Sequence, residues 1–486
     1  MTETYRGELP FDHPQEACGV FGIVAPGLDV ARITYFGLYA LQHRGQESAG
    51  IAAASGEAGS ELRIHTRMGL VATAFNEEIL QSLGGSHAIG HTRYSTTGSS
   101  VACNAGPVLA QSDLGPIAVA HNGNLTNAAL LRARLEAAGE RFETSTDSEV
   151  LARVIACADG RTVADRLLAA MAQFEGAYSL AVLTPTEMYA VRDPLGLRPL
   201  SLGRLGNGWV VASETCALAT TGAAFVRDVA PGEIVRITAE AGPESLALVP
   251  GERDALCVFE LIYFARPDSM MGGDRIHLLR QRMGAELARE QPADGDIVVP
   301  LPDSAIPAGI GYASESGIPY AEALIKNRYI GRTFIQPDQH LREVGIALKF
   351  NPLPEVLEGK RVVLIDDTIV RGTTSRPIVQ LLRDAGAREV HMRVHAPPIL
   401  WPCFMGVDFA SRSELIAARL DANIAAIGRQ IGVDSLAYLS LDGLFRAIGQ
   451  PREGFCTACL TGEYPVPLYE DASKFTLERT LLGAAD

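Results

Sequence analysis

The sequence predicts two differently built halves, an α+β half followed by an α/β half with a parallel sheet. From residue 19 to about residue 250, short apolar strands recur too often for a simple βαβ chain, which favours α+β layering. From about residue 272, strands alternate with helical stretches, as they do in a parallel sheet. The polar stretch 240–254, which contains Pro and Gly, separates the two patterns. A chain of 486 residues is long enough for two or three such domains.

In the N-terminal half, short apolar runs mark the strands and leucines at helical spacing mark the helices. Strands are expected at residues 18–24, 90–94, 117–121, 177–183 and 209–212. Residues 38–42 suit the end of a helix, and residues 127–138 suit a complete amphipathic helix.

In the C-terminal half, strands are expected at residues 296–300, 319–325, 362–365 and 389–394. A mobile segment is expected from residue 326 to 334, because three cations, a Gly and aromatic residues are mixed there. Residues 413–449 have a helical pattern, and a short cysteine-bearing tail follows. The chain thus divides into residues 1–17, 18–250, 251–412 and 413–486.

Composition narrows the class of protein. The 42 Lys and Arg residues against 57 Asp and Glu residues give a net charge of −15, which argues against non-specific binding of nucleic acid. No apolar run approaches the roughly 20 residues that span a bilayer, so no membrane association is expected. Residues 1–17 carry four carboxylates and no apolar core, unlike a secretory signal. We therefore expect a cytoplasmic protein, with its eight cysteines as thiols, ligands or nucleophiles.

Residues 361–374 run from a buried strand into a polar turn. Asp366 and Asp367 stand at the carboxyl end of the strand, where open α/β sheets place ligand sites. Gly372 and Thr373 follow in a turn that offers N–H and hydroxyl donors to a phosphate. The pattern predicts a phosphate cradle beside an acidic pair that binds Mg²⁺ or sugar hydroxyls. The alternative is a strand that ends in a solvated, capped turn.

The same stretch closely resembles the phosphoribosyl pyrophosphate (PRPP) signature of type I phosphoribosyltransferases. The resemblance implies that PRPP is bound by Asp366, Asp367, Thr368, Arg371, Gly372, Thr373 and Thr374. Residues 298–304 have the same design, a strand that breaks into a Pro-stiffened loop. By resemblance, Asp303 and Ser304 face the pyrophosphate, and Ser304 joins Asp366 and Asp367 around Mg²⁺. Ala305 stands where some relatives carry Gly, so the loop geometry is expected to differ slightly.

A cationic segment follows this loop in the sequence. The resemblance implies that Lys326, Arg328 and Arg332 close over bound PRPP as a lid. Closure matters because a ribosyl oxocarbenium-like species must be shielded from water. The alternative is a solvated basic loop.

Cys18 begins the first predicted strand, and taken alone it would be an ordinary buried thiol. Its run Cys-Gly-Val-Phe-Gly-Ile and the block Gln-His-Arg-Gly-Gln-Glu-Ser-Ala-Gly at 42–50 resemble class II glutamine amidotransferases. Such domains are N-terminal nucleophile (Ntn) hydrolases with αββα layers, in which the α-amino group of the terminal Cys acts as base for its own thiol. The resemblance implies that residues 1–17 are a propeptide. An α-amino pKa near ~8 makes this base available at neutral pH.

Three later motifs match the same family in order. By resemblance, Arg93 pairs with the glutamine α-carboxylate, for which an Arg fork is well shaped. The Asn122 side chain and the Gly123 N–H form an oxyanion hole, and Asp147 holds the substrate α-ammonium. Taken singly, Asn122-Gly123 is typical of a hairpin turn and Asp147 of a helix N-cap. The shared order of the motifs favours the family interpretation.

Four cysteines form a third candidate site: Cys257, Cys403, Cys456 and Cys459. The last two make a C-x-x-C pair, which in a cytosolic protein is redox-active or binds zinc or an iron–sulfur cluster. Four thiolates satisfy either Zn²⁺ or a four-iron cluster, and the spacing does not separate the two. Amidophosphoribosyltransferases with a propeptide resemble this chain at all four positions and carry a [4Fe–4S] cluster. The resemblance therefore implies that cluster, as a structural staple.

Both halves together resemble the amidophosphoribosyltransferase family. The resemblance implies a propeptide (1–17), an amidotransferase domain (18–250), a phosphoribosyltransferase domain (251–412), and C-terminal helices with a cluster-binding tail (413–486). It also implies that ammonia from glutamine reaches C1 of PRPP through an internal channel, in the first committed step of purine synthesis. Purine nucleotide feedback inhibitors and a homotetramer are expected on the same ground. Two rivals are a PRPP-sensing regulator without catalysis and an ammonia-using enzyme with a vestigial glutaminase.

Overall fold

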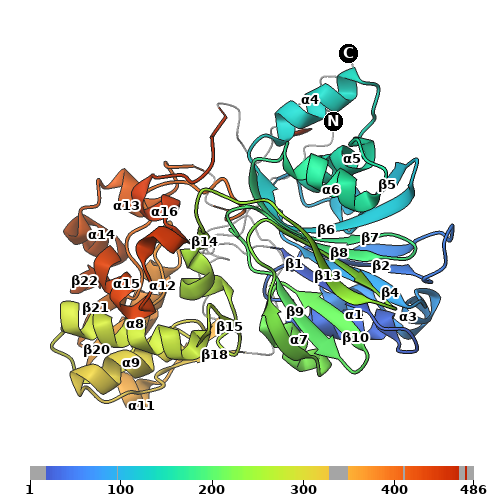
Figure 1. The fold of residues 1–486 in the computed structure, drawn as a ribbon. Helices are drawn as coiled ribbons and strands as arrows, with labels where there is room; N and C mark the ends of the chain where they lie inside the picture. The colour runs from blue at the N-terminus through green and yellow to red at the C-terminus, as the bar shows by residue number, and fades with distance from the viewer. Residues whose placement is uncertain (1–17, 96, 328–348, 409–410, 470–476, 479–486) are drawn as a thin grey trace, which may run out of the picture.

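The structure is a computed structural model that describes residues 18–95, 97–327, 349–408, 411–469 and 477–478. Figure 1 shows two bodies side by side, one with most of the strands and one with the C-terminal helices. Among the described residues, no helix is both long and apolar enough to cross a membrane.

The N-terminal half contains two antiparallel sheets. The seven-stranded sheet has the order β11-β9-β10-β1-β4-β2-β3 and the six-stranded sheet the order β13-β12-β8-β7-β6-β5. The first comprises β1 (Gly19–Val24), β2 (Ser48–Ala54), β3 (Arg63–Met68), β4 (His87–Arg93), β9 (Ser201–Leu205), β10 (Gly208–Ala212) and β11 (Ala224–Asp228). The second comprises β5 (Val108–Ser112), β6 (Gly115–Leu125), β7 (Gly176–Leu183), β8 (Met188–Arg192), β12 (Glu233–Thr238) and β13 (Gly242–Leu248). The expected α+β character and the five expected strands are confirmed.

Two groups of helices cover these sheets. The helices are α1 (Val30–Ala40), α2 (Val71–Ala74), α3 (Glu77–Ser82), α4 (Ala128–Ala137), α5 (Asp147–Cys157), α6 (Val163–Met171) and α7 (Thr215–Thr221). Strand β1 shows how the layers form, because alternate side chains face opposite sides. Phe21 and Ile23 join Leu38 of α1 in one core. Val20 instead packs with Ala118 of the other sheet, in a core between the sheets.

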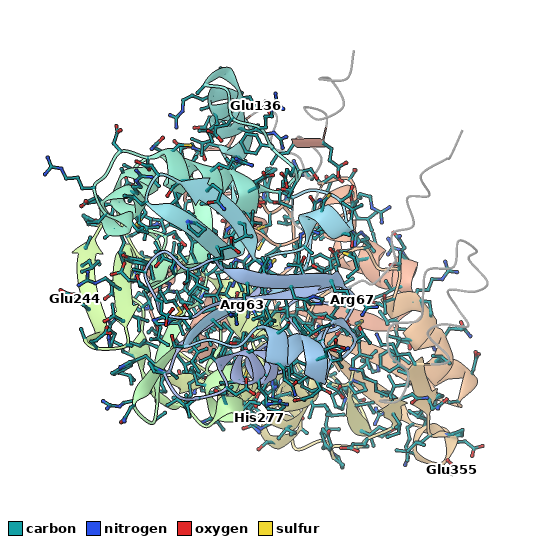
Figure 2. The ribbon with its side chains drawn as sticks, turned by 90° about the vertical axis from the view of Figure 1, so that its right-hand side faces the viewer. Arg63, Arg67, Glu136, Glu244, His277 and Glu355 are labelled. Atoms are coloured by element: carbon teal, nitrogen blue, oxygen red, sulfur yellow. The ribbon has the colours of Figure 1, made fainter. Side chains whose placement is uncertain are left out.

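A third core lies between the six-stranded sheet and α4 to α6. Edge strand β3 stays polar on its outer side, and Figure 2 shows its Arg63 and Arg67 at the surface. Charged side chains at a sheet edge discourage pairing with other chains. The sequence stretch 240–254 is no free linker, because β13 occupies part of it and pairs with β12.

The C-terminal half is built on a parallel sheet of order β17-β20-β21-β22, as predicted. Its strands are β17 (Ile297–Pro300), β20 (Arg361–Asp366), β21 (Glu389–Val394) and β22 (Ser435–Tyr438). Its helices are α8 (Ile276–Glu290), α9 (Ile306–Ser316), α11 (Pro354–Leu357), α12 (Ser375–Asp384), α13 (Ile416–Arg419), α14 (Ile424–Ile431), α15 (Leu441–Ile448) and α16 (Ala458–Thr461). A π-helix, Glu260–Phe264, precedes them.

Two predictions for this half were wrong in part. Residues 413–449 are not all helical, because β22 lies among them and pairs with β21. Four residues are too few for a periodicity to be read, so pairing with a neighbour decides their conformation. The stretch 319–325 contributes one bridge, Tyr320 to Val298, and then β18 (Leu324–Lys326) pairs antiparallel with β19 (Phe350–Pro352). That hairpin lies outside the main sheet.

Candidate active sites and a cysteine-lined cavity

Cys18 directly precedes β1, next to the end of β4. The β1–β4 register pairs Gly19 with Thr92, so Cys18 lies beside Arg93 and Tyr94. Its Sγ–H donates to the Tyr94 carbonyl over 3.4 Å, and the residue is 7% exposed. Burial raises the pKa of the thiol to about 11, against the opposing effects of Tyr94 and Arg93. The thiol therefore needs a base before it can attack as a thiolate.

Arg93 is held in one orientation by backbone carbonyls. Its Nη2 donates to the carbonyls of Thr97 (3.1 Å) and Gly98 (3.3 Å). Its Nη1 donates to the Ser99 carbonyl and to Glu47, each over 3.3 Å. A fixed, buried guanidinium is a site for a carboxylate ligand.

The segment 97–99 is itself held from two sides. Asn104 donates to the Ser99 carbonyl over 2.8 Å. The Ser99 N–H donates to the Glu478 carboxylate over 2.6 Å, and its hydroxyl bonds the same oxygen. Neither Glu47 nor Glu478 was predicted as a site residue. Glu47 lies within the 42–50 block, whereas no sequence signal marks Glu478.

Asn122 and Gly123 lie inside strand β6, paired with Ser179 and Tyr178 of β7. The hairpin-turn alternative is therefore wrong. Both polar atoms of the Asn122 amide are buried and have no hydrogen-bond partner among the described residues. Gly123 has φ +147°, and a Cβ there would meet the Ala177 carbonyl oxygen at 2.0 Å. A buried amide donor without a partner among the described residues has the chemistry of an oxyanion donor, and the backbone at Gly123 leaves no room for a side chain.

Asp147 is the first residue of α5, and the N-cap is Thr146. The N-cap alternative for Asp147 is therefore wrong. Its carboxylate accepts from the Leu125 N–H over 3.1 Å and lies 3.7 Å from Nδ1 of His121. Burial lowers the pKa of His121, so the carboxylate faces a neutral ring.

The groups of this site come from both sheets. His91 of β4 hydrogen bonds the His121 carbonyl of β6 over 2.9 Å, which joins the strands of Arg93 and Asn122. The charges of Arg93 and Asp147 both act on the Cys18 thiol. The structure thus brings together all five residues predicted for the glutamine site.

The second site lies where β17 and β20 end. The two strands are parallel neighbours, and Pro300 pairs with Ile365, so their carboxyl ends meet. Asp366 and Asp367 are at most 1% exposed. The Asp367 N–H donates to Asp366 over 2.8 Å, and the Thr368 hydroxyl donates to Asp367 over 2.7 Å. The alternative of a solvated turn is wrong for this buried pair.

The turn after β20 leads into α12. Gly372 has φ +77°, which only glycine adopts readily. Thr373 is exposed and Thr374 is buried at the start of the helix. Arg371 pairs with Glu414 over 3.1 Å, so it is held toward the C-terminal segment.

The loop after β17 faces an open cavity of about 420 Å³. Asp303 is exposed and accepts from Lys326 over 2.7 Å, while Ser304 is half-buried. Asp303 and Lys326 line the cavity, and so do Tyr320 and Asn351. Arg328, Arg332 and residues 1–17 lie outside the described residues.

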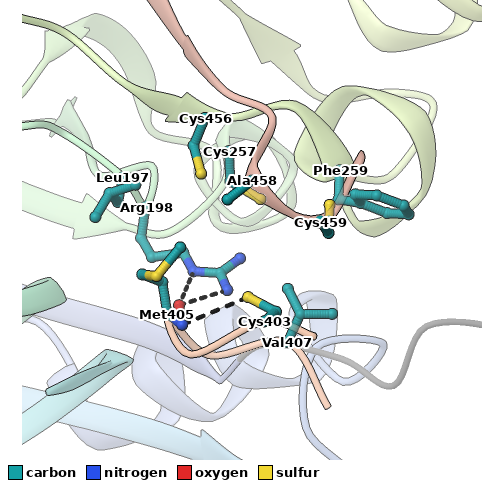
Figure 3. Close-up of a pocket in the computed structure, with 10 residues that line it drawn as sticks. All are labelled: Leu197, Arg198, Cys257, Phe259, Cys403, Met405, Val407, Cys456, Ala458 and Cys459. Atoms are coloured by element: carbon teal, nitrogen blue, oxygen red, sulfur yellow. Dashed lines mark hydrogen bonds between the residues drawn. The ribbon is translucent and has the colours of Figure 1, made fainter. Parts of the chain in front are cut away.

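The four predicted cysteines come together from three chain segments, since Cys456 and Cys459 lie in one C-x-x-C stretch. Cys257 and Cys456 are paired residues of the short strands β14 (Leu256–Cys257) and β23 (Phe455–Cys456). Cys459 is in α16 and Cys403 in a loop, and all four line one small cavity (Figure 3). Arg198 lies at its edge and donates to the Met405 carbonyl over 2.8 Å. Burial raises the pKa of all four thiols, that of Cys257 to about 11, so a cation is needed to hold them as thiolates.

The cysteine loop also touches the glutamine site. Asn124 donates from its amide to the Phe404 carbonyl over 2.9 Å, and it accepts from the Thr97 hydroxyl over 2.6 Å.

In the part of the chain that the structure describes, no three His, Cys, Asp or Glu side chains form a group that could hold one metal ion.

Comparisons with known proteins agree with this geometry. A family model described as a glutamine amidotransferase domain matches residues 91–220. The amidophosphoribosyltransferase of Synechococcus elongatus is 54% identical, over 96% of this chain and 95% of its own. A solved structure of the allosteric regulatory enzyme of purine biosynthesis superposes with a TM-score of 0.89 at 46% identity, covering 95% of this chain and 99% of the other. Glutamine PRPP amidotransferase from B. subtilis, complexed with ADP and GMP, gives 0.87 at 46% identity, covering 94% and 99%.

Proposed function

This chain belongs to the amidophosphoribosyltransferase family, and from that premise we propose how its two sites share one reaction. The enzyme transfers the amide nitrogen of glutamine to PRPP in purine biosynthesis. Glutamine, PRPP and water give phosphoribosylamine, glutamate and pyrophosphate. We assign the glutamine half-reaction to the N-terminal half and the PRPP half-reaction to the C-terminal half.

In the glutamine half-reaction, the Cys18 thiol attacks the amide carbon and ammonia leaves. Because burial raises the pKa of this thiol, we assign the base to the α-amino group that removal of residues 1–17 would free. The observation that best supports this half-reaction is the Asn122 amide, which is buried next to Gly123 and has no hydrogen-bond partner among the described residues. It would donate to the oxyanion that develops on the amide oxygen.

Charged groups would orient the substrate. Arg93 would bind the α-carboxylate and Asp147 the α-ammonium, since both are buried and act on Cys18. The two packed sheets with helices outside them support placing this half among the Ntn hydrolases.

At the PRPP site, two buried carboxylates and one hydroxyl fit Mg²⁺, which prefers hard oxygen donors. Ser304, Asp366 and Asp367 would hold the ion, whose charge offsets that of the pyrophosphate. Thr368 and the turn from Arg371 to Thr374 would bind the 5′-phosphate. Lys326, which pairs with Asp303 beside the cavity, would contact the pyrophosphate. Arg328 and Arg332 stay proposed lid residues.

We assign the cysteine cavity to an iron–sulfur cluster because all four thiols line it and the family resemblance implies the cluster. Four thiolates would also satisfy a single Zn²⁺, so metal analysis decides between the two. A [4Fe–4S] cluster held by Cys257, Cys403, Cys456 and Cys459 would supply the positive charge that these thiolates need.

The proposed cluster has its own chemical test. Iron and acid-labile sulfide are expected at about four of each per chain. Stoichiometric zinc without sulfide would contradict the cluster and leave the rest of the proposed function intact.

We also propose a cytoplasmic homotetramer that purine nucleotides inhibit. The solved relative that binds ADP and GMP supports nucleotide control. Eight cysteines without a disulfide suit a reducing compartment.

Pyrophosphate release from PRPP and Mg²⁺ tests the assignment of the two half-reactions. We expect release with glutamine and with ammonium as the nitrogen donor. Release with ammonium alone would locate a fault in the N-terminal half, such as a retained propeptide. Release with neither donor, from folded protein, would favour the PRPP-sensing regulator.

A further inference from the structure

Four charged side chains form a buried network where the two halves meet. Arg44, Arg198, Glu214 and Glu260 are each at most 1% exposed. Arg44 donates from Nη2 to Glu260 over 2.6 Å and from Nη1 to Glu214 over 2.6 Å. Arg198 donates to Glu260 over 3.2 Å. The two guanidinium groups offset the two carboxylates, and Nε2 of His43 also lies 2.6 Å from Glu214 at the edge of the network.

Each half of the chain contributes one carboxylate that forms hydrogen bonds with the other half. Glu214, from the N-terminal half, accepts from the Ser269 hydroxyl (2.7 Å) and the Arg266 N–H (2.9 Å) of the C-terminal half. Glu260, from the C-terminal half, accepts only from Arg44 and Arg198 among the hydrogen bonds described. Its carboxylate is therefore inserted into the N-terminal half.

One end of the network is the nucleophile. Nε of Arg44 donates to the backbone carbonyl of Cys18 over 3.3 Å. The other two guanidinium nitrogens of Arg44 are taken by Glu214 and Glu260, so its plane is fixed on three edges. The Cys18 carbonyl oxygen is two bonds from Cα, and the thiol is joined to Cα through Cβ. The hydrogen bond from Arg44 therefore holds the backbone from which the thiol projects.

The other end of the network lies beside the PRPP site. Glu260 begins the π-helix Glu260–Phe264, a rare element that is frequent at functional sites. Arg280 donates to the carbonyls of Leu261 (2.9 Å) and Ala265 (2.8 Å), and so holds this turn. The charge of Asp367 acts on Arg280. Arg280 thus holds the segment that supplies Glu260, and Arg280 itself interacts electrostatically with Asp367 of the proposed PRPP site.

We propose that Glu260 is a positioning residue for the glutamine half-reaction, supplied by the other half of the chain. By fixing Arg44, it holds the Cys18 backbone in the orientation from which the thiol attacks. This inference rests on the proposed role of Cys18. It implies that the glutaminase half is incomplete without the segment that follows residue 250.

The test compares kcat for two nitrogen donors in full-length, processed enzyme. In Glu260→Gln, one carboxylate oxygen becomes an NH₂ that faces the Arg44 guanidinium. We expect kcat with glutamine to fall about tenfold or more, with KM for glutamine little changed, as for loss of a charged hydrogen-bond partner. The rate with ammonium should stay close to that of the parent. Glu260→Asp keeps the charge and should recover part of the loss.

A double-mutant cycle tests whether Glu260 acts on Cys18 through Arg44 or only stabilises the fold. If Glu260 acts through Arg44, then Glu260→Gln adds little to the loss of kcat already caused by Arg44→Lys, whereas independent effects would multiply. Thr215→Val is the matched control, since it removes the hydrogen bond from the Met270 N–H across the same junction without touching Arg44, Glu214 or Glu260. It should leave the ratio of the two rates unchanged.

Other outcomes would overturn the inference. Equal loss of both rates in the Glu260 variants, or loss of folded protein in both, would make Glu260 only a structural contact. Unchanged glutamine kcat in Glu260→Gln would do the same. If Cys18→Ala itself keeps glutamine activity, the fault lies instead in the proposed function.

Discussion

The two candidate sites differ in how completely the fold builds them. The glutamine site is made of buried side chains on strands β4 and β6, on helix α5 and just before β1, with Cys18, Arg93, Asn122 and Asp147 all at most 7% exposed. At the PRPP site, the acidic pair, Thr368 and Thr374 are buried, while Asp303 and Thr373 are exposed, and Asp303 lines an open cavity of about 420 Å³. A pre-built site holds its groups for chemistry, whereas an open site gains its shape with its ligand. Substitutions should therefore act on kcat with glutamine in the first site and on both nitrogen donors in the second.

The largest expected effect isolates the glutamine site. Cys18→Ala should abolish the use of glutamine and spare that of ammonium, because only one half-reaction needs the thiol. Steady-state pyrophosphate release with each donor measures this. Cys216→Ala, also buried, is the control and should change neither rate. Equal loss with both donors would erase the distinction between the sites.

The oxyanion group gives the next effect and separates chemistry from stability. Asn122→Ala should lower kcat with glutamine on the order of a hundredfold, as for removal of one oxyanion donor. It should not lower Tm, because the amide has no hydrogen-bond partner among the described residues.

Asn127 provides the matched comparison for this substitution. It is also buried, and it donates to the Gln173 carbonyl over 2.8 Å. Asn127→Ala should therefore lower Tm and leave kcat close to that of the parent. A large fall in Tm with Asn122→Ala would show that the amide is structural.

At the PRPP site, the loss should not depend on the nitrogen donor. Asp366→Ala and Asp367→Ala should each reduce the rate with glutamine and with ammonium alike, by roughly tenfold to a hundredfold for a lost electrostatic partner. Asp296→Asn, at the opposite end of the same sheet, should leave both rates unchanged. A lower rate with glutamine alone would mean that the acidic pair serves the glutamine half-reaction, which would contradict its assignment to the PRPP site.

The smallest expected effect tests whether the glutamine site is wholly pre-built. Glu478→Ala removes the acceptor for Ser99, whose carbonyl helps to hold Arg93. KM for glutamine should rise about threefold to tenfold, as for loss of one hydrogen bond, with kcat little changed. Tyr469→Phe removes another contact of the same tail, with Glu175, and should have no such effect. An unchanged KM in Glu478→Ala would mean that segment 97–99 is held well enough without the tail.

The sequence predicted most of what lies within one local segment. Strands such as 19–24 and 361–366 were visible as apolar runs, and the acidic pair at the end of the second was predicted as ligand groups, although its burial was not. The strand 435–438 was missed, because its four residues carry no period and pairing with β21 makes them a strand.

Contacts between distant segments could not be predicted. Glu260 binds Arg44 across 216 positions, and Glu478 binds Ser99 across 379. A lone glutamate in a sequence has many possible partners, and only the packing of the two halves selects one. The local alternatives failed for the same reason: Asn122-Gly123 has turn chemistry, yet its pairing with β7 keeps it in a strand.

The pairing of β14 with β23 determines when, during synthesis of the chain, the cysteine cavity can form. Cys257 pairs with Cys456, which the ribosome adds about 200 residues later, a delay of roughly 10 to 40 s at 5 to 20 residues per second. By then every strand of the two antiparallel sheets and of the parallel sheet has already been synthesised. The cysteine cavity therefore gains its last lining residues late in synthesis, and a chain truncated before residue 456 lacks both Cys456 and Cys459. A group bound by all four cysteines would therefore have to enter after nearly the whole chain has been made.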